Sequence, residues 1–274
     1  MIGKFKINQK ILTDNILLLS NDNCNLKYSK NNEADINSKI FDAVNGVISA
    51  KTLTDNLFPE KQPHIFISHS SRDVKLAVSL ANTLYEKYDI ISFIDSQLWG
   101  HIEHALKEMH ELHCKIPGSS HYSYRKSNNL LSHIHTILSM ALMRVMDNAD
   151  SVIFIESDNS IYQYMGDDKI SPIDIIERTS ETLSPWISSE VNFANKLRAK
   201  GHKDRDGKLI GGLESLSLND EKMLAEDAQL KITHDLDLTN FIEITDENFK
   251  KSLSLKKETP IENLDMIYRK YVHG

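Results

Sequence analysis

Short apolar runs alternate with amphipathic stretches over the middle of this chain. Residues 64–67, 90–94 and 151–155 are rich in β-branched and aromatic side chains, and polar residues follow each run. Such runs predict buried strands. Over residues 77–84 and 134–145, apolar residues recur at i, i+3, i+4 and i+7, which predicts helices. Strands that alternate with helices indicate an α/β domain with a mostly parallel sheet.

A further helix is predicted to begin at Pro185, because Ser184 suits the N-cap and proline suits the first helical position. Trp186 and Glu190 are one turn apart and are expected at the border between core and solvent. A carboxylate held against an indole loses hydration, which raises its pKa. A solvated glutamate beside an edge tryptophan is the alternative. The core stripe of this helix is predicted to comprise Ile187, Val191, Ala194 and the stem of Arg198.

Residues 1–62 are predicted to form an N-terminal extension that packs on the main domain or mediates association. Asparagine-rich and lysine-rich sequence gives way to apolar residues at helical spacing between Ile40 and Ile48, and Leu57-Phe58-Pro59 ends this pattern. One amphipathic helix is therefore expected here. The apolar runs at the N-terminus are broken by polar residues, unlike those of a signal peptide.

Composition narrows the function classes. With 40% hydrophobic and 26% charged residues, the chain has the composition of an ordinary soluble globular protein. The formal net charge of −7 argues against a nucleic-acid partner, which requires a basic face. Two cysteines are too few for a disulfide framework, which favours a reducing cytoplasm. No segment has 18 apolar residues in a row, so no membrane span is expected.

Polar residues follow two of the predicted strands. Residues 68–71 (Ser-His-Ser-Ser) follow the first strand and Asp95 ends the second. In open α/β sheets ligands bind beyond the carboxyl ends of the strands, so these side chains are candidates for one binding site. Helix capping by serine or Asp73, and a turn-forming role for Asp95, are the simpler alternatives. Trp99 lies in the next loop, where a large aromatic residue more often packs than binds a ligand.

Motifs for metals and phosphates are absent from the sequence. His110, His113 and Cys114 do not have the paired spacing of a zinc site, and we expect no metal. Neither a G-x-G-x-x-G nor a G-x-x-x-x-G-K motif occurs, so the sequence supports neither a Rossmann dinucleotide site nor a P-loop.

Four segments, HIFISHSSRD, ISFIDS, ADSVIFIES and SPWISSEV, occur in an order that resembles the TIR (Toll/interleukin-1 receptor) domain family. The resemblance covers residues 63–255, with 232–238 as the last strand, and leaves 256–274 as a C-terminal helix or tail. It implies a flavodoxin-like fold, in which a central, mostly parallel sheet has helices on both faces. The long stretch from Trp99 to Asp150 looks most like stand-alone bacterial TIR proteins, which often belong to phage-defence systems such as Thoeris.

The resemblance implies an NAD+-consuming enzyme, with NAD+ as substrate and no cofactor. Glu190 matches the essential glutamate of catalytic members, and Trp186 matches the neighbouring aromatic position. The loop after the first strand borders the nucleotide, and Arg72 stands one step beyond the position of the arginines in some members. Assembly into homo-oligomers is expected, because catalytic TIR domains generally require it. The predicted substrate-binding residues are Ser68, His69, Ser70, Ser71, Arg72, Asp95, Trp99 and Trp186.

The chemistry follows from the substrate. Cleavage of the nicotinamide–ribose bond builds positive charge on the sugar, as glycoside hydrolysis does. Because nicotinamide is already a cationic leaving group, one carboxylate that orients the ribose and stabilises the oxocarbenium-like state is sufficient. Attack by water gives ADP-ribose, and attack by a group of the substrate itself gives a cyclic isomer. The sequence leaves both products open. A cyclic signal would act on a downstream effector.

The sequence leaves three other functions open. A non-catalytic TIR module would act by self-association or by binding a TIR partner. A receiver domain phosphorylated on Asp95 would require an acidic pair at the end of the first strand, where Ser68 and His69 stand. A nucleoside-processing enzyme with a similar sheet is a further alternative.

Overall fold

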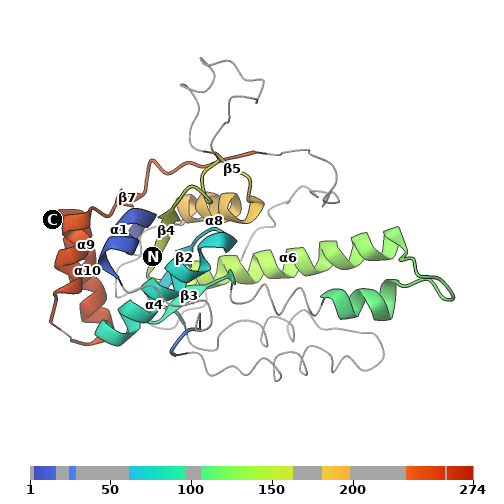
Figure 1. Ribbon diagram of the computed structural model, residues 1–274, viewed down its shortest axis with the longest axis horizontal. Helices are drawn as coiled ribbons and strands as arrows, with labels where there is room; N and C mark the ends of the chain where they lie inside the picture. The colour runs from blue at the N-terminus through green and yellow to red at the C-terminus, as the bar shows by residue number, and fades with distance from the viewer. Residues whose placement is uncertain are drawn as a thin grey trace, which may run out of the picture.

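The computed structural model describes residues 3–16, 25–28, 62–96, 106–162, 181–197, 233–256 and 258–273. Five parallel strands form its main sheet in the order β3-β2-β4-β1-β7 (Figure 1). The strands are β1 (Gly3–Asn8), β2 (Ile65–Ser68), β3 (Ser92–Ile94), β4 (Ser151–Glu156) and β7 (Ile242–Glu243). The predicted α/β class is confirmed, because β2, β3 and β4 are the three strands expected from the apolar runs.

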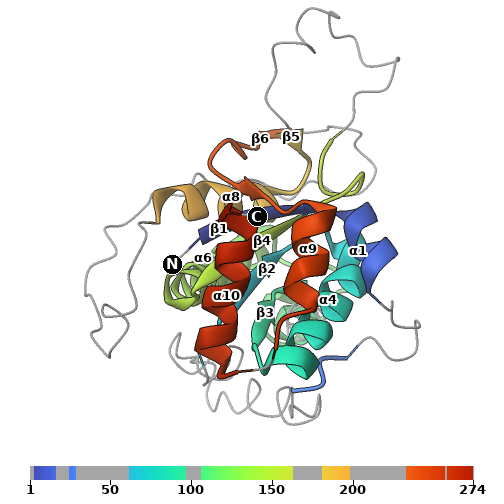
Figure 2. The ribbon, with the colours of Figure 1, turned by 90° about the vertical axis from the view of Figure 1, so that its left-hand side faces the viewer.

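Helices cover both faces of this sheet, as Figure 2 shows. One face carries α1 (Gln9–Asn15), α4 (Val74–Tyr88), α9 (Asp246–Leu253) and α10 (Pro260–His273). The other face carries α6 (Tyr124–Asn148) and α8 (Pro185–Lys196). Two short turns of other helix types, η3 (Ser71–Asp73) and η4 (His110–Cys114), precede α4 and α6.

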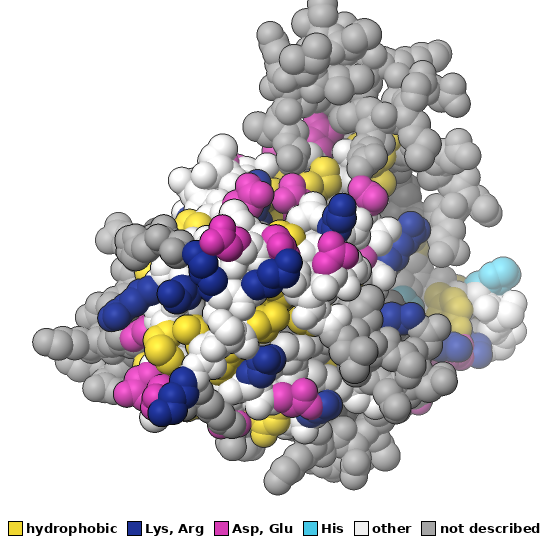
Figure 3. Space-filling model, turned by 60° about the vertical axis from the view of Figure 1, so that its left-hand side comes forward, with side chains coloured by type: hydrophobic (Ala, Val, Ile, Leu, Met, Phe, Trp, Pro, Cys, Tyr) yellow, Lys and Arg dark blue, Asp and Glu magenta, His cyan; other side chains and the backbone are white. Residues whose placement is uncertain are grey.

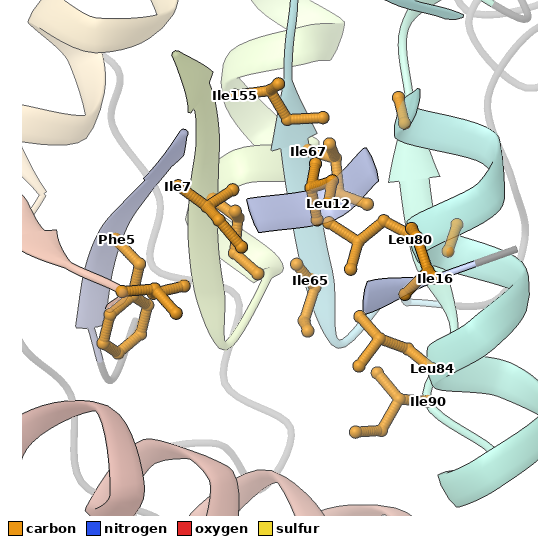
Figure 4. Close-up of a cluster of buried hydrophobic side chains, with 14 of the residues drawn as sticks. Phe5, Ile7, Leu12, Ile16, Ile65, Ile67, Leu80, Leu84, Ile90 and Ile155 are labelled. Atoms are coloured by element: carbon orange, nitrogen blue, oxygen red, sulfur yellow. The ribbon is translucent and has the colours of Figure 1, made fainter. Parts of the chain in front are cut away.

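The alternation of side chains along the strands builds two separate cores. Ile65 and Ile67 of β2 face α4, where they pack with Leu80 (Figure 4). Phe66 lies between them in sequence and points to the opposite face, where it joins the core under α6 and α8. Strands of a parallel sheet are buried on both faces, which explains their continuous apolar runs.

The prediction that residues 1–62 form an extension is wrong for the first 16. Strand β1 pairs with β4 from Gly3 to Asn8 and with β7 on its other side. Phe5 is 2% exposed and Ile7 is 1% exposed, so β1 is an interior strand of the domain. Lys4 and Lys6 alternate with Phe5 and Ile7, so the sequence lacks the continuous apolar run that marks the other strands. On the opposite face, Lys4 Nζ lies 3.2 Å from Asn195 Oδ1. The helix expected between Ile40 and Ile48, and Leu57-Phe58-Pro59, lie outside the described residues.

The last strand also differs from the expectation. Residues 232–238 were expected to form the last strand of the main sheet, but the position beside β4 is occupied by β1 and the last position by β7. The short strand β6 (His234–Asp235) pairs antiparallel with β5 (Glu181–Thr182) in a separate two-stranded sheet. Strand β1 pairs with β4 along six residue pairs, so residues 232–238 cannot pair with that edge of β4. The last strand of the main sheet is β7.

The predicted C-terminal helix is confirmed as α10, and it is part of the domain core rather than a tail. Ile267 and Tyr271 are buried in the first core. The rings of Tyr268 and Tyr271 lie edge-on to Phe5, with centroids 5.8 and 5.2 Å from its ring. The two ends of the chain therefore stabilise one another.

Helix α6 is longer than the sequence suggested and projects from the body of the molecule together with η4 (Figure 1). We call this projection, residues 106–148, the arm. Hydrophobic, histidine and basic side chains gather at its tip (Figure 3). The exposed large apolar side chains of the tip are Leu112, Ile116, Tyr122 and Tyr124. None of the helices in the described part of the chain has the length and apolar character to cross a membrane.

Candidate active site

Glu190 is the centre of a buried polar cluster. Ser184 caps α8 by accepting a hydrogen bond from Ile187 N (3.3 Å), and Pro185 opens the first turn, as predicted. Ile187, Val191 and Ala194 form the buried stripe as expected, whereas Arg198 lies outside the described residues. Glu190 lies on the same stripe and is 3% exposed, so its predicted place at the border with solvent is wrong. Its spacing from Ile187 (i+3) faces it toward the sheet.

Ser68 is the partner of Glu190 across the sheet–helix interface. Its hydroxyl donates a hydrogen bond of 2.5 Å to Glu190 Oε2. Ser68 is the last residue of β2 and follows Phe66 on the face that α8 covers, because side chains of a strand alternate between its two faces. The sheet and α8 together place the hydroxyl at the carboxylate, although 122 residues separate the two in sequence.

Asp95 brings a second carboxylate to the same position. Strand β3 pairs with β2 up to Ile67 and Ile94, so the next residues on the two strands are Ser68 and Asp95. Burial raises the pKa of Glu190 well above its ordinary value, the negative charge of Asp95 raises it further, and the bond from Ser68 opposes both. A side-chain hydrogen bond between Glu190 and Asp95 also raises the pKa of Glu190, and Glu190 Oε1 is buried. Glu190 therefore retains its proton more readily than an ordinary glutamate.

His69 supports the cluster from the adjoining loop. Its side chain is fully buried, and Nδ1 lies 3.5 Å from Asp95 Oδ1. Its Nε2 lies 2.8 Å from the hydroxyl of Ser96, a residue that sequence reasoning did not single out. The ring thus bridges two consecutive residues that follow β3, which fixes the position of Asp95 relative to Ser68.

The other predicted residues lie outside this cluster. Ser70 caps η3, where its hydroxyl accepts a hydrogen bond of 3.4 Å from Arg72 N. Ser71 and Arg72 are exposed. Trp99 lies outside the described residues. Trp186 is half-buried on α8 and stacks on His135 of α6, with ring centroids 5.7 Å apart and an interplanar angle of 26°.

A narrow hollow between α6 and α8 reaches Glu190. Its volume of about 10 Å³ is close to the least that one water molecule requires. Among the described residues, this hollow is too narrow for a ligand larger than water. The hollow is lined by Ser139, Leu142, Met143, Met146, Trp186, Ser189, Glu190 and Phe193.

Sequence reasoning missed the α6 side of this hollow. Ser139, Leu142, Met143 and Met146 follow one another at i, i+3, i+4 and i+7, which places them on one face of α6. That spacing was a usable signal, but Ser139 reads as a polar interruption of the apolar stripe. Only the packing of α8 on α6 shows that this face meets Trp186 and Glu190.

Comparisons of the chain with protein-family models, with curated proteins and with solved structures found no match. Within the described ranges, no group of three histidine, cysteine, aspartate or glutamate side chains is arranged to hold a metal ion. His110, His113 and Cys114 all lie in η4 of the arm, and Cys114 is a buried free thiol.

Proposed function

We propose that this chain is a TIR-like enzyme that cleaves the nicotinamide–ribose bond of NAD+, with Glu190 as the catalytic carboxylate. The supporting observation is the buried Glu190 carboxyl group, which the Ser68 hydroxyl contacts at 2.5 Å beside Asp95. This cluster stands at the carboxyl ends of two neighbouring parallel strands, β2 and β3. Ligands of open α/β sheets bind beyond these ends.

The paired carboxylates suit a substrate whose reacting part is cationic. Asp95 disfavours the charged form of Glu190, whereas the positive charge of the nicotinamide ring favours it. Substrate binding would therefore promote ionisation of Glu190, and the carboxylate would stabilise the positive charge that develops on the ribose. Ser68 holds Oε2 of the carboxylate in place, and Oε1 is the oxygen that would contact the ribose hydroxyls. Trp186 supplies a flat surface for a ring of the substrate.

Because the hollow is narrow, we propose that NAD+ binding separates α6 and α8 near Trp186. A resting state of low activity follows, and assembly of several copies is the proposed trigger. The reaction releases nicotinamide and gives ADP-ribose with water, or a cyclic isomer with an internal nucleophile. We propose that the product acts in the cytoplasm as a signal to a downstream effector in defence against phage.

The direct test is to incubate the purified protein with NAD+ and to separate the products by chromatography. We expect release of nicotinamide by the wild-type protein and its loss in Glu190→Gln. Glu181→Gln is the matched control, because Glu181 is also buried (7% exposed) but belongs to β5. Unchanged NAD+ at all protein concentrations, and after addition of lysate from phage-infected cells, would overturn the enzymatic proposal.

A non-catalytic TIR module is the second candidate, and the arm favours it. Exposed apolar side chains that gather in one place mark interaction sites. Leu112 and Tyr124 are each 71% exposed at the tip of the arm. If binding alone is the function, Leu112→Ser and Tyr124→Ser abolish activity in cells, while Glu190→Gln leaves it intact. The enzymatic proposal predicts loss of activity in Glu190→Gln.

A further inference from the structure

A second buried polar cluster lies behind the β2–α4 loop. Asp73 stands immediately before α4 but makes no capping hydrogen bond with its side chain, and Ser70 caps η3 instead. The carboxylate of Asp73 is 5% exposed and binds residues that follow β4. Its Oδ1 accepts a hydrogen bond of 2.7 Å from Asn159 Nδ2, and its Oδ2 accepts one from the Ser157 hydroxyl. A helix-capping role does not account for these contacts.

The turn at residues 157–160 is built around the same hydroxyl. Ser157 Oγ accepts hydrogen bonds from Asn159 N at 3.2 Å and from Ser160 N at 3.1 Å. Ser160 Oγ in turn accepts one of 2.9 Å from Ser157 N. Because the single hydroxyl proton of Ser157 points to Asp73, all hydrogen-bonding capacity of this group is used. We call Asp73, Ser157 and Asn159 the clamp.

The clamp joins the ends of β2 and β4, at the point where the helical connections that follow these two strands lie on opposite faces of the sheet. Strands β2 and β4 are neighbours; α4 follows β2 on one face, and α8 follows β4 on the other. Such a point opens the crevice that holds ligands in α/β sheets. The β2–α4 loop is therefore held at both ends. Ser68 contacts Glu190 at one end, and Asp73 contacts the turn after β4 at the other.

We propose that Asp73 is a positioning residue of this site. Through Ser157 and Asn159 it fixes the β2–α4 loop against β4, and it thereby holds the Ser68 hydroxyl and the His69 ring at the carboxylates of Glu190 and Asp95. Asp73 itself does not reach the cluster. The catalytic consequence rests on the proposed NAD+ cleavage, whereas the structural consequence can be measured without substrate.

Asp73→Asn is the informative change, because it keeps the shape of the side chain and replaces one acceptor oxygen by an amide donor. Asn159 can still donate to the remaining oxygen. The Ser157 hydroxyl then faces an amide group, and its lone pairs are already occupied by two backbone N–H groups. We expect hydrogen exchange of backbone amides 69–73 and 157–160 to accelerate about tenfold, the effect of losing one buried hydrogen bond. Exchange at Ile7 in β1 should not change.

The matched controls separate a local from a general effect. Asp14→Asn makes the same chemical change at an exposed position of α1 and should leave every amide unchanged. Ser157→Ala removes the partner hydroxyl and also the acceptor of Asn159 N and Ser160 N, so it should accelerate amides 69–73 as Asp73→Asn does and amides 157–160 more strongly. The double variant should be no worse at amides 69–73 than Ser157→Ala alone, since both changes remove the same Asp73–Ser157 bond. If Asp73→Asn does not fold, Ser157→Ala and its effect on amides 69–73 provide the same test.

The activity of the variants provides the catalytic readout. We expect kcat/KM for NAD+ to fall about 100-fold, since a displacement near 1 Å has this effect on a catalytic group. The pH at which activity rises should also move upward, because the bond from Ser68 lowers the pKa of Glu190. Unchanged exchange at 69–73, or acceleration confined to 157–160, would overturn the proposal. If the wild-type protein does not cleave NAD+, the proposed function fails, and exchange alone decides the structural role of the clamp.

Discussion

Replacing Glu190 by glutamine should stabilise the folded protein at neutral pH. Burial, and then the charge of Asp95, raise the pKa of Glu190 above its ordinary value of 4.5. Between 4.5 and this raised pKa the folded state binds a proton that the unfolded state has released. The free energy of unfolding therefore falls as pH rises through this interval, at a limiting slope of about 1.4 kcal/mol per pH unit. Glutamine cannot ionise, so the variant escapes this loss.

Glutamine also preserves the shape of the site. Its carbonyl oxygen can accept the hydrogen bond from Ser68, and its amide can donate to Asp95 in place of a like charge. Below pH 4.5 the two proteins should differ by less than about 1.5 kcal/mol, as expected for one neutral hydrogen-bonding group replacing another. Above that pH the difference should grow in favour of the variant. A gain of stability with a loss of activity is the expected trade-off for a functional site.

Urea unfolding of both proteins at intervals from about pH 4 to 8 measures this difference directly. The exposed Glu247, whose side chain is 77% accessible, provides the control. Glu247→Gln should stay within about 0.5 kcal/mol of the wild type. A stability difference for Glu190→Gln that is independent of pH, or that favours the wild type as pH rises, would show that Glu190 is ionised in the folded state and would refute the reasoning.

Three further predictions concern other parts of the molecule. Phe5→Ala should lower the free energy of unfolding, measured in urea, by about 3–5 kcal/mol. Tyr124→Ala at the exposed tip should change it by less than about 0.5 kcal/mol, and equal effects of the two changes would contradict an interior β1. Burial lowers the pKa of His135, so its protonation below pH 6.5 should change the fluorescence of Trp186, on which it stacks, and His135→Gln should remove this change. The rate of NAD+ cleavage should rise with pH until Glu190 is ionised, and a rate that falls with pH would exclude a carboxylate as the active form.

The strand-end rule correctly predicted that Ser68 and Asp95 lie at one edge of the sheet. The ends of parallel strands meet at one edge of the sheet, so Ser68 and Asp95 were expected together, and the register of β2 and β3 makes them neighbours. The depth of Glu190 was not predictable in the same way. Helical spacing fixes which residues share a face, but the width of the buried stripe depends on how closely α8 packs on the sheet.

The local sequence also could not show which of two residues, Ser70 or Asp73, caps the helix that follows β2. Ser70 and Asp73 are both good capping residues, and the sequence favours each equally. The structure uses Ser70 as the cap, because Asp73 is bound to the turn after β4. That turn is more than 80 residues distant in the chain, as the separation of 86 between Asp73 and Asn159 shows. No local signal reports such a contact.

The interior position of β1 has a consequence for the order in which the domain folds during synthesis. Phe5 is synthesised long before its partners on the two sides, Ile153 and Ile242. Contacts between such distant residues are slow to form, because a long loop must close first. Until residue 242 emerges, the edge of β1 that β7 covers remains open, and such edges promote aggregation. The nascent chain should therefore depend on chaperones until residue 242 has emerged.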